Sequence, residues 1–265
     1  MNLHAAVIQY APTTDKDENL ELVKQLIGKA ADQGADLAVL PEYATYAKPD
    51  LDETYIENAE ELDGRTVTTL RALSTEKNIV IIAGMNEPNG QGRVFNTLVG
   101  VQEGELKSTY RKLHLYDAFG AHESKWIEPG AIEEPQLLEV NGLKVGLQTC
   151  YDLRFPEVSR VLVDAGADVL ALPAAWVPGP LKENHWTTLL RARAIENTVY
   201  VVAAGQSAPT GVGHSSIIDP MGNTIAMIGD DVGIARADLS PERIANVRTI
   251  NPALTGRRFT VQPKV

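Results

Sequence analysis

The chain has 265 residues, of which 44% are hydrophobic, and carries a formal net charge of −11 at pH 7. This length allows one large domain or two small ones, and the negative charge argues against a nucleic-acid partner or a basic membrane-binding surface. The single cysteine excludes an intrachain disulfide, and no CxxC pair or His/Cys cluster indicates a metal site.

In the first half of the chain, predicted strands alternate with predicted helices. Short apolar runs predict buried strands, and hydrophobic residues that recur every three or four positions predict helices. Asp15 followed by Glu18 is typical of a helix start, and Gly34 is typical of a helix end. In chain order, we expect a strand at 3–9, a helix at 15–34, a strand at 36–40, a helix around 67–73, a strand at 79–83, and a hairpin of strands at 94–101 and 106–110.

The second half repeats this order of elements. We expect a strand at 143–149, a helix at 156–165, a strand at 168–172, a helix at 183–197, a strand at 199–203, and a hairpin of strands at 215–218 and 224–228. Local sequence repeats as well, because QGADLAVLPEYA at 33–44 is similar to AGADVLALPAAW at 165–176. Such self-similarity at half the chain length predicts two βαβ-rich halves related by pseudo-twofold symmetry.

Two sheets packed face to face, with helices outside both, would bury all of these apolar runs. The sequence therefore predicts an α/β fold of four layers, an αββα sandwich with two pseudo-symmetric halves. We assign residues 1–239 to a single domain. Residues 240–265 contain three prolines and several charges, and we expect them to form an irregular C-terminal arm.

Three chemically active side chains follow the ends of predicted strands. Glu42, Lys112 and Cys150 each come directly after an apolar run, and side chains at the carboxyl ends of adjacent strands converge in space. Together they supply a nucleophile, a base to activate it and a cation to receive negative charge. Each also has a purely structural interpretation: a buried thiol that packs as a small hydrophobe, a carboxylate in a solvated loop, and a surface ammonium.

Five sequence blocks resemble the nitrilase superfamily of carbon–nitrogen hydrolases. Their order and separation agree with that family, and the resemblance covers roughly residues 3–239. It implies the same four-layer αββα sandwich that the internal repeat predicts, and an enzyme without a cofactor. The blocks are PEYA at 41–44, YRKLHLYD at 110–117, TCYDLRFPE at 149–157, RARAIENTVYVVAAG at 191–205 and GHSSIIDPMGN at 213–223.

The resemblance also implies a catalytic role for each of the three strand-end residues. Glu42 would be the general base that takes the proton of Cys150, and Cys150 would attack the substrate carbonyl carbon. Lys112 would stabilise the resulting oxyanion together with the backbone N–H of Tyr151. The reaction would pass through a thioester intermediate that water hydrolyses.

A second glutamate is implied beside the lysine. Glu123 matches it and would orient the substrate amide or Lys112. Glu128 lies five residues later and is a competing assignment, since the sequence alone does not separate the two.

Two further residues are candidates for substrate binding. Arg154 follows the nucleophile by four residues, and its guanidinium would hold a substrate carboxylate with two hydrogen bonds. The alternative for Arg154 is a salt bridge to Asp152, Glu157 or another acid in a loop. Trp176 ends the strand that corresponds to the Glu42 strand, and it would either wall the pocket or pack in the core.

The blocks CYDLRFPE and RARAIEN resemble most the branch that holds omega-amidases and deaminated glutathione amidases. That branch implies hydrolysis of the terminal amide of a small carboxylate-bearing substrate, with release of ammonia. An N-carbamoyl amino acid amidohydrolase is the main alternative among enzymes. A catalytically silent binding or scaffold protein on the same fold is the alternative of another class.

We expect a cytoplasmic protein without nucleic-acid or membrane partners. The start MNLHAAVIQYAP does not have the basic residues of a signal peptide, and no apolar run approaches the roughly 18–20 residues that span a bilayer. The resemblance implies a homodimer or a larger homo-oligomer built through outer helices. Val158, Leu162, Trp186 and Leu190 would then present apolar surface to a partner, unless they face their own sheet.

Overall fold

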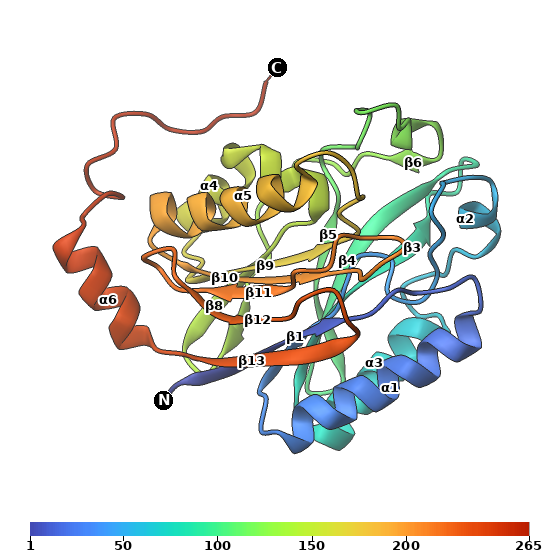
Figure 1. Cartoon of the computed structure of the whole chain (residues 1–265), viewed down its shortest axis with the longest axis horizontal. Helices are drawn as coiled ribbons and strands as arrows, with labels where there is room; N and C mark the ends of the chain where they lie inside the picture. The colour runs from blue at the N-terminus through green and yellow to red at the C-terminus, as the bar shows by residue number, and fades with distance from the viewer. Residues whose placement is uncertain (265) are drawn as a thin grey trace.

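In the computed structural model, which describes residues 1–264, two β-sheets pack face to face between two layers of helices (Figure 1). The helices α1 (Lys16–Asp32) and α3 (Arg65–Lys77) cover one sheet, and α4 (Pro156–Asp164) and α5 (Lys182–Asn197) cover the other. The four-layer αββα sandwich predicted from the sequence is therefore confirmed. The remaining helical segments are α2 (Thr54–Glu57), η1 (Glu123–Lys125), η2 (Cys150–Arg154) and α6 (Pro241–Ile250).

The two sheets share one strand order, which confirms the two similar halves. In each sheet three parallel strands are followed by two antiparallel ones, and an extra antiparallel strand borders the first parallel strand. The first sheet runs β13 (Gly233–Leu239), β1 (Leu3–Gln9), β2 (Leu37–Val39), β3 (Val80–Pro88), β4 (Val94–Gln102) and β5 (Glu105–Arg111), with β6 (Ile127–Glu128) paired to β4. The second runs β7 (Leu138–Val140), β8 (Leu143–Leu147), β9 (Val169–Ala174), β10 (Tyr200–Gly205), β11 (Ser216–Ile218) and β12 (Thr224–Met227).

Alternation along the strands divides the core into layers. In β1, Ala5 and Val7 belong to the core between the two sheets, whereas Ala6 and Ile8 pack under the helices of the first half. This division follows from the period of two in strand side chains. Strands buried on both faces have no polar side, which explains why they appear in the sequence as continuous apolar runs.

The predicted helix boundaries of α1 are confirmed by its caps. The Asp15 side chain accepts hydrogen bonds from the backbone N–H groups of Asp17 and Glu18, which satisfies donors that have no partner within the helix. Gly34 follows the helix with a φ of +81°, a conformation in which a Cβ is unfavourable.

The prediction that residues 240–265 are irregular is wrong for residues 241–250, which form α6. Pro241 does not break this helix because it occupies the first turn, where its missing N–H costs no hydrogen bond. Ile244 and Val247 are buried in the structure and anchor the helix. Residues 251–264 contain no helix or strand, as expected. Residue 265 lies outside the described residues, and the single domain at 1–239 stays a prediction.

The apolar residues of the outer helices do not face outward. Val158, Leu162, Trp186 and Leu190 are all buried within the chain, and three of them, Leu162, Trp186 and Leu190, join the core that the second sheet forms with α4 and α5. The hypothesis that these four side chains offer a partner surface is therefore wrong. Among the helices of the described residues, none is both long and apolar enough to cross a bilayer.

Candidate active site

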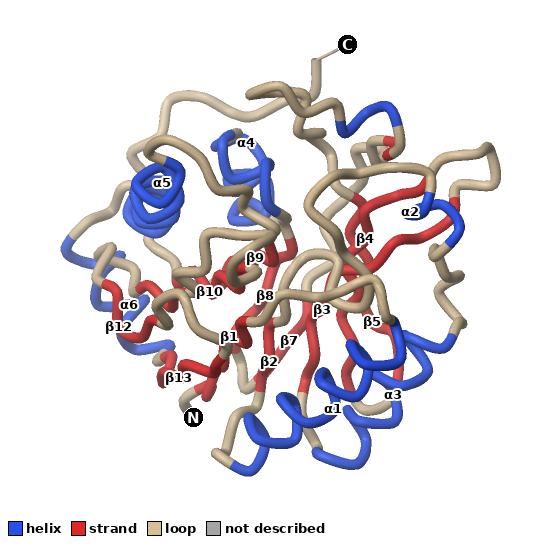
Figure 2. The backbone as a smooth tube through the Cα atoms, turned by 45° about the vertical axis from the view of Figure 1, so that its right-hand side comes forward, coloured by secondary structure: helices blue, strands red, loops and turns tan. Residues whose placement is uncertain are grey.

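The parallel strands of both sheets end at one edge of the sandwich, and the loops that follow them gather there (Figure 2). Glu42 leaves β2 at this edge, opposite Ala175 after β9 and Gln206 after β10. The backbone N–H of Ala175 donates to Glu42 Oε2 at 2.6 Å, and the Gln206 side chain donates to the Glu42 carbonyl at 2.8 Å. Groups from the second sheet therefore fix both the carboxylate and the backbone of Glu42.

A buried ammonium joins two buried carboxylates at this edge. Lys112 Nζ donates to Glu42 Oε1 at 3.0 Å and to Glu123 Oε1 at 2.9 Å, and the three residues are each at most 2% exposed. Asn96 donates a further hydrogen bond to Glu42, and the Tyr43 hydroxyl donates one to Glu123. Charges this deeply buried require partners, and here each of the three has at least two.

The structure separates the two competing glutamates. Glu123 bonds Lys112 and also accepts a hydrogen bond from the backbone N–H of Tyr116. Glu128 lies on β6 and pairs with Arg93 instead. Of the two, only Glu123 is therefore positioned to act beside the lysine.

Cys150 lines the same small pocket, of about 50 Å³, as Glu42, Lys112 and Glu123. It begins the 3₁₀ turn η2, is 8% exposed and has a φ of +45°. Such a backbone conformation is costly for a residue other than glycine and occurs at functional sites. The N–H of Tyr151 lies in the first turn of η2, where N–H groups have no partner within the helix. The four candidate catalytic side chains thus surround one cavity.

The net effect of burial and nearby charges is to raise the pKa values of both Cys150 and Lys112, so that the thiol stays neutral and the amine stays charged. Burial raises the pKa of the Cys150 thiol well above its usual value, Glu42 raises it further, and Lys112 only partly opposes them. Burial alone would lower the pKa of Lys112, but Glu123 and Glu42 together raise it well above the usual range. The resting site therefore holds a neutral thiol beside a permanently charged ammonium, and a base must remove the thiol proton during attack.

The raised thiol pKa predicts a loss of stability at alkaline pH. An unfolded thiol titrates near 8.5, and the folded protein holds the Cys150 proton more tightly. The stabilisation is complete below the unfolded pKa and is lost as pH rises towards the folded one. Between about pH 9 and 10 we expect the free energy of unfolding to fall by up to about 1.4 kcal/mol per pH unit more in wild type than in Cys150→Ala. Urea unfolding curves measure this, and parallel pH dependences would contradict it.

Two anchors hold the turn that carries the nucleophile. Asp152 is fully buried and accepts hydrogen bonds from the Tyr110 hydroxyl and from the backbone and ring of His114. At the other end of the turn, the Arg193 guanidinium donates two hydrogen bonds to the carbonyl of Leu153. These contacts fix η2 against both β5 and α5.

Arg154 lies close to aromatic side chains and has no acidic partner among residues 1–264. Its guanidinium carbon is 4.8 Å from the centre of the Trp176 ring, and Nη2 is 3.3 Å from Nδ1 of His185. Asp152 and Glu157 do not pair with it, and no other described carboxylate lies within ion-pair distance. The salt-bridge alternative is therefore wrong. Trp176 packs against Trp186 in the core and also contacts Arg154, and it is not among the residues that line the pocket of Cys150.

Several residues of the site were not identified from the sequence. Tyr43 stands next to Glu42 within the PEYA block, and this position was the one signal that pointed to it. The others are single polar residues in a strand, a helix or loops, and only the tertiary structure brings them to or beside the pocket. They are Asn96, Tyr116, Lys182 and Gln206.

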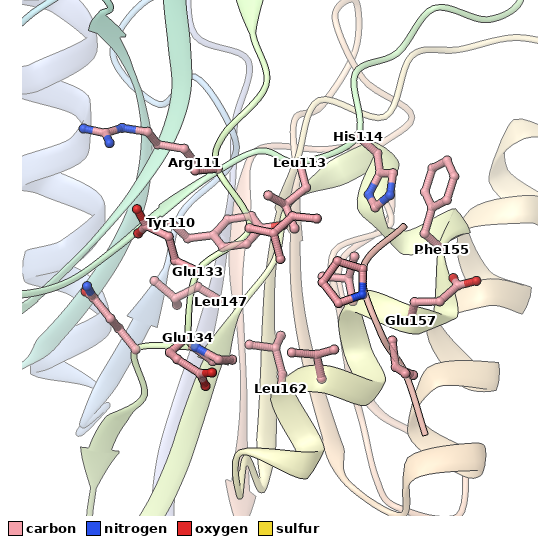
Figure 3. Close-up of a pocket in the computed structure, with 18 of the residues that line it drawn as sticks. Tyr110, Arg111, Leu113, His114, Glu133, Glu134, Leu147, Phe155, Glu157 and Leu162 are labelled. Atoms are coloured by element: carbon pink, nitrogen blue, oxygen red, sulfur yellow. The ribbon is translucent and has the colours of Figure 1, made fainter. Parts of the chain in front are cut away.

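A second pocket, of about 550 Å³, lies between β5, the loop at 131–136, α4 and the C-terminal stretch at 261–264 (Figure 3). Hydrocarbon from Leu113, Leu147 and Leu162 forms much of its wall. It contains none of the candidate site residues, all of which lie in the described part of the chain. Its lining includes cations and carboxylates, such as Arg111 and Glu157, but not the Cys150 nucleophile, so this cavity does not provide for the predicted chemistry.

Gly84 of β3 packs against the backbone of Glu42. We therefore expect the methyl group added by Gly84→Ala to lower the catalytic rate strongly. An added Cβ would lie 2.7 Å from Glu42 Cα and 2.7 Å from Tyr43 N, so the backbone would have to move. Because small displacements of catalytic groups cost up to about 100-fold in rate, we expect Gly84→Ala to lower kcat/KM at least about tenfold.

A glycine in an open position provides the control for Gly84→Ala. Gly28 lies on α1, and the nearest atom to an added Cβ there is 4.0 Å away. We expect Gly28→Ala to keep its activity and to gain up to about 1 kcal/mol of stability. Equal activity in the two variants would show that Gly84 does not position Glu42.

Comparisons with known proteins agree with this geometry. The carbon–nitrogen hydrolase family matches residues 4–249. A deaminated glutathione amidase from Escherichia coli O157:H7 is 44% identical over 252 residues, which cover 95% of each chain. One from Mus musculus is 35% identical over 271 residues, covering 96% of this chain and 82% of the mouse protein. The crystal structure of Saccharomyces cerevisiae Nit3, a member of branch 10 of the nitrilase superfamily, superposes with a TM-score of 0.86 at 29% identity over 97% of each chain.

Proposed function

Because the chain belongs to the carbon–nitrogen hydrolase family, and is thus a hydrolase of carbon–nitrogen bonds, we propose that it is an amidase. It releases ammonia from the terminal amide of a small carboxylate-bearing molecule. The observation that carries the proposal is the ammonium of Lys112, bonded to Glu42 and Glu123 in the wall of the pocket that Cys150 lines.

The first half of the proposed reaction forms a thioester. Glu42 accepts the Cys150 proton while the sulfur attacks the amide carbonyl carbon, which becomes a tetrahedral oxyanion. Lys112 and the backbone N–H of Tyr151 donate hydrogen bonds to that oxyanion. Glu42 then passes the proton to the leaving nitrogen, the carbon–nitrogen bond breaks, and ammonia departs.

The second half restores the enzyme. Glu42 takes a proton from water as the water oxygen attacks the thioester carbon, and Lys112 again receives the negative charge. The carbon–sulfur bond breaks, the carboxylic acid product leaves, and the Cys150 sulfur recovers its proton from Glu42. Glu123 holds Lys112 in place through both steps, in agreement with their hydrogen bond.

The substrate class is supported by the relatives and by one side chain. Both curated relatives described above are named deaminated glutathione amidase, and such a substrate carries carboxylates besides the amide that is cleaved. Arg154 stacks on Trp176 without a carboxylate partner among the described residues. It is therefore available to hold a substrate carboxylate with two hydrogen bonds.

Three substrates assayed side by side test the proposal: ammonia release is measured for 2-oxoglutaramate and an N-carbamoyl amino acid, and release of the dipeptide amine for deaminated glutathione, whose amide nitrogen belongs to a cysteine residue. We expect turnover of deaminated glutathione or 2-oxoglutaramate and little or none of an N-carbamoyl amino acid. Release of both ammonia and carbon dioxide from the N-carbamoyl compound would favour the alternative amidohydrolase. Failure on every amide, with Cys150 also inert to an amide-directed electrophile, would leave a binding or scaffold protein.

We also propose that the enzyme is a cytoplasmic homodimer or larger homo-oligomer. A nucleophilic thiol must stay reduced to react, which the cytoplasm ensures. Light scattering on the purified protein measures the assembly, and a mass equal to one chain of 28.7 kDa would contradict it.

A further inference from the structure

A second buried cation lies beside the site. Lys182, the first residue of α5, is 4% exposed, and its Nζ donates a hydrogen bond to the Tyr116 hydroxyl at 2.9 Å. The same Nζ lies 4.6 Å from the centre of the Phe119 ring and 5.3 Å from that of Trp176. Lysine is among the residues that are rarely buried without a charged partner, and Lys182 has no ion pair among the described residues.

Lys182 and Arg154 share the same aromatic surroundings. Arg154 also contacts Trp176 and Phe119, with its guanidinium carbon 4.8 Å and 5.7 Å from the two ring centres. The two cations therefore lie at most about 10 Å apart, beside the same rings. Burial, followed by the positive charge of Arg154, lowers the pKa of Lys182. The charge of Arg154 thus disfavours the charged form of Lys182.

This pair of like charges is unusual in so acidic a protein. The chain has 35 aspartates and glutamates against 24 lysines and arginines, yet none of the described acids pairs with Arg154 or Lys182. Cation–π contacts compensate only part of the cost of burying a charge. An anion from outside the chain would complete the compensation.

The pair lies one side chain away from the nucleophile. Tyr116 lines the pocket of Cys150, and its hydroxyl accepts the hydrogen bond from Lys182. Its backbone N–H donates to Glu123, which bonds Lys112. A thiolate at Cys150 would raise the pKa of Lys182, which places the two groups within electrostatic range of each other. A group bound at the two cations would therefore lie next to the pocket in which Cys150 attacks a carbonyl carbon.

We propose that Lys182 and Arg154 form a two-cation subsite for the carboxylate of the substrate, with Lys182 as a specificity-determining residue. The inference rests on the proposed amidase function and extends it. The subsite selects substrates in which a carboxylate and a terminal primary amide are separated by a short chain. Trp176 and Phe119 wall the subsite, and their low polarity strengthens the ion pairs.

A matched pair of amides tests the role of Lys182. Glutaramate carries a carboxylate, and pentanamide has a methyl group in its place. Charge-assisted hydrogen bonds are worth about 1.5–3 kcal/mol, so in Lys182→Met we expect the ratio of kcat/KM for glutaramate over pentanamide to fall about 10- to 100-fold, mainly through KM of glutaramate. Lys182→Arg keeps the charge and should retain most of the ratio. Lys144→Met removes an exposed lysine on β8 and serves as the control.

The outcomes separate a specificity role from a structural one. A ratio that stays constant in Lys182→Met, whether both activities fall together or neither falls, would overturn the proposal. Glutarate binding to Cys150→Ala, measured by calorimetry, does not depend on turnover. If Lys182→Met on that background weakens glutarate binding, the subsite stands even where no amide is hydrolysed. Unchanged glutarate affinity would refute the subsite while leaving the amidase function intact.

Discussion

Cys150→Ala is expected to lose amide hydrolysis by roughly 10,000-fold or more while it remains folded. The variant removes the only atom that forms the thioester, and water in its place is a much weaker nucleophile. The pocket loses only one sulfur atom from an edge of the core, so the secondary structure should be retained. Ammonia release measures the activity, and circular dichroism reports the fold.

The single cysteine allows a labelling control for this variant. Because the chain has one thiol, a thiol-selective electrophile that labels wild type once and abolishes its activity acts at Cys150. Cys150→Ala should remain unlabelled. Full turnover in Cys150→Ala would remove the thiol from the mechanism and, with it, the proposed function.

Lys112→Met is expected to lose about 1,000-fold in kcat and to be less stable than wild type by about 3–5 kcal/mol. The substitution keeps the volume of the side chain but leaves Glu42 and Glu123 buried without their shared cation. It also removes the donor to the oxyanion. Steady-state kinetics and urea unfolding measure the two effects.

A second substitution separates the two losses in Lys112→Met. Adding Glu123→Gln removes one of the uncompensated charges, so the double variant should regain much of the stability. It should not regain activity, since the oxyanion donor is still missing. If Lys112→Met retains wild-type kinetics, or if activity returns together with stability, Lys112 has only a structural role.

The sequence was sufficient for the layers of the fold because its apolar runs are unambiguous. Strands buried on both faces appear as short hydrophobic segments, and the repeat around Leu40 and Leu172 indicates two similar halves. The half-exposed β13 was not predicted, since its charged residues alternate with small ones and resemble a loop. The helix α6 was not predicted because Pro241 was interpreted as a helix breaker rather than a helix start.

The site was predictable where its residues follow strands, and unpredictable where they lie in loops. Glu42, Lys112 and Cys150 stand directly after or at the end of apolar runs, and the structure brings them to one pocket. Their catalytic roles stay proposals. Lys182 and Tyr116 show no such pattern, because a buried cation at the start of a helix is identified only by its neighbours in space. The same holds for the choice between Glu123 and Glu128, which differ in partners rather than in sequence context.

The hydrogen bonds from Ala175 and Gln206 to Glu42 mean that neither half of the chain forms the active site alone. A polypeptide severed between β5 and β8 would leave the acid and the amine on one fragment and the sulfur on the other. Each fragment could retain its own strands and helices and still be inert. Turnover would return only when the two fragments associate. The appearance of activity would therefore report the packing of the two sheets against each other.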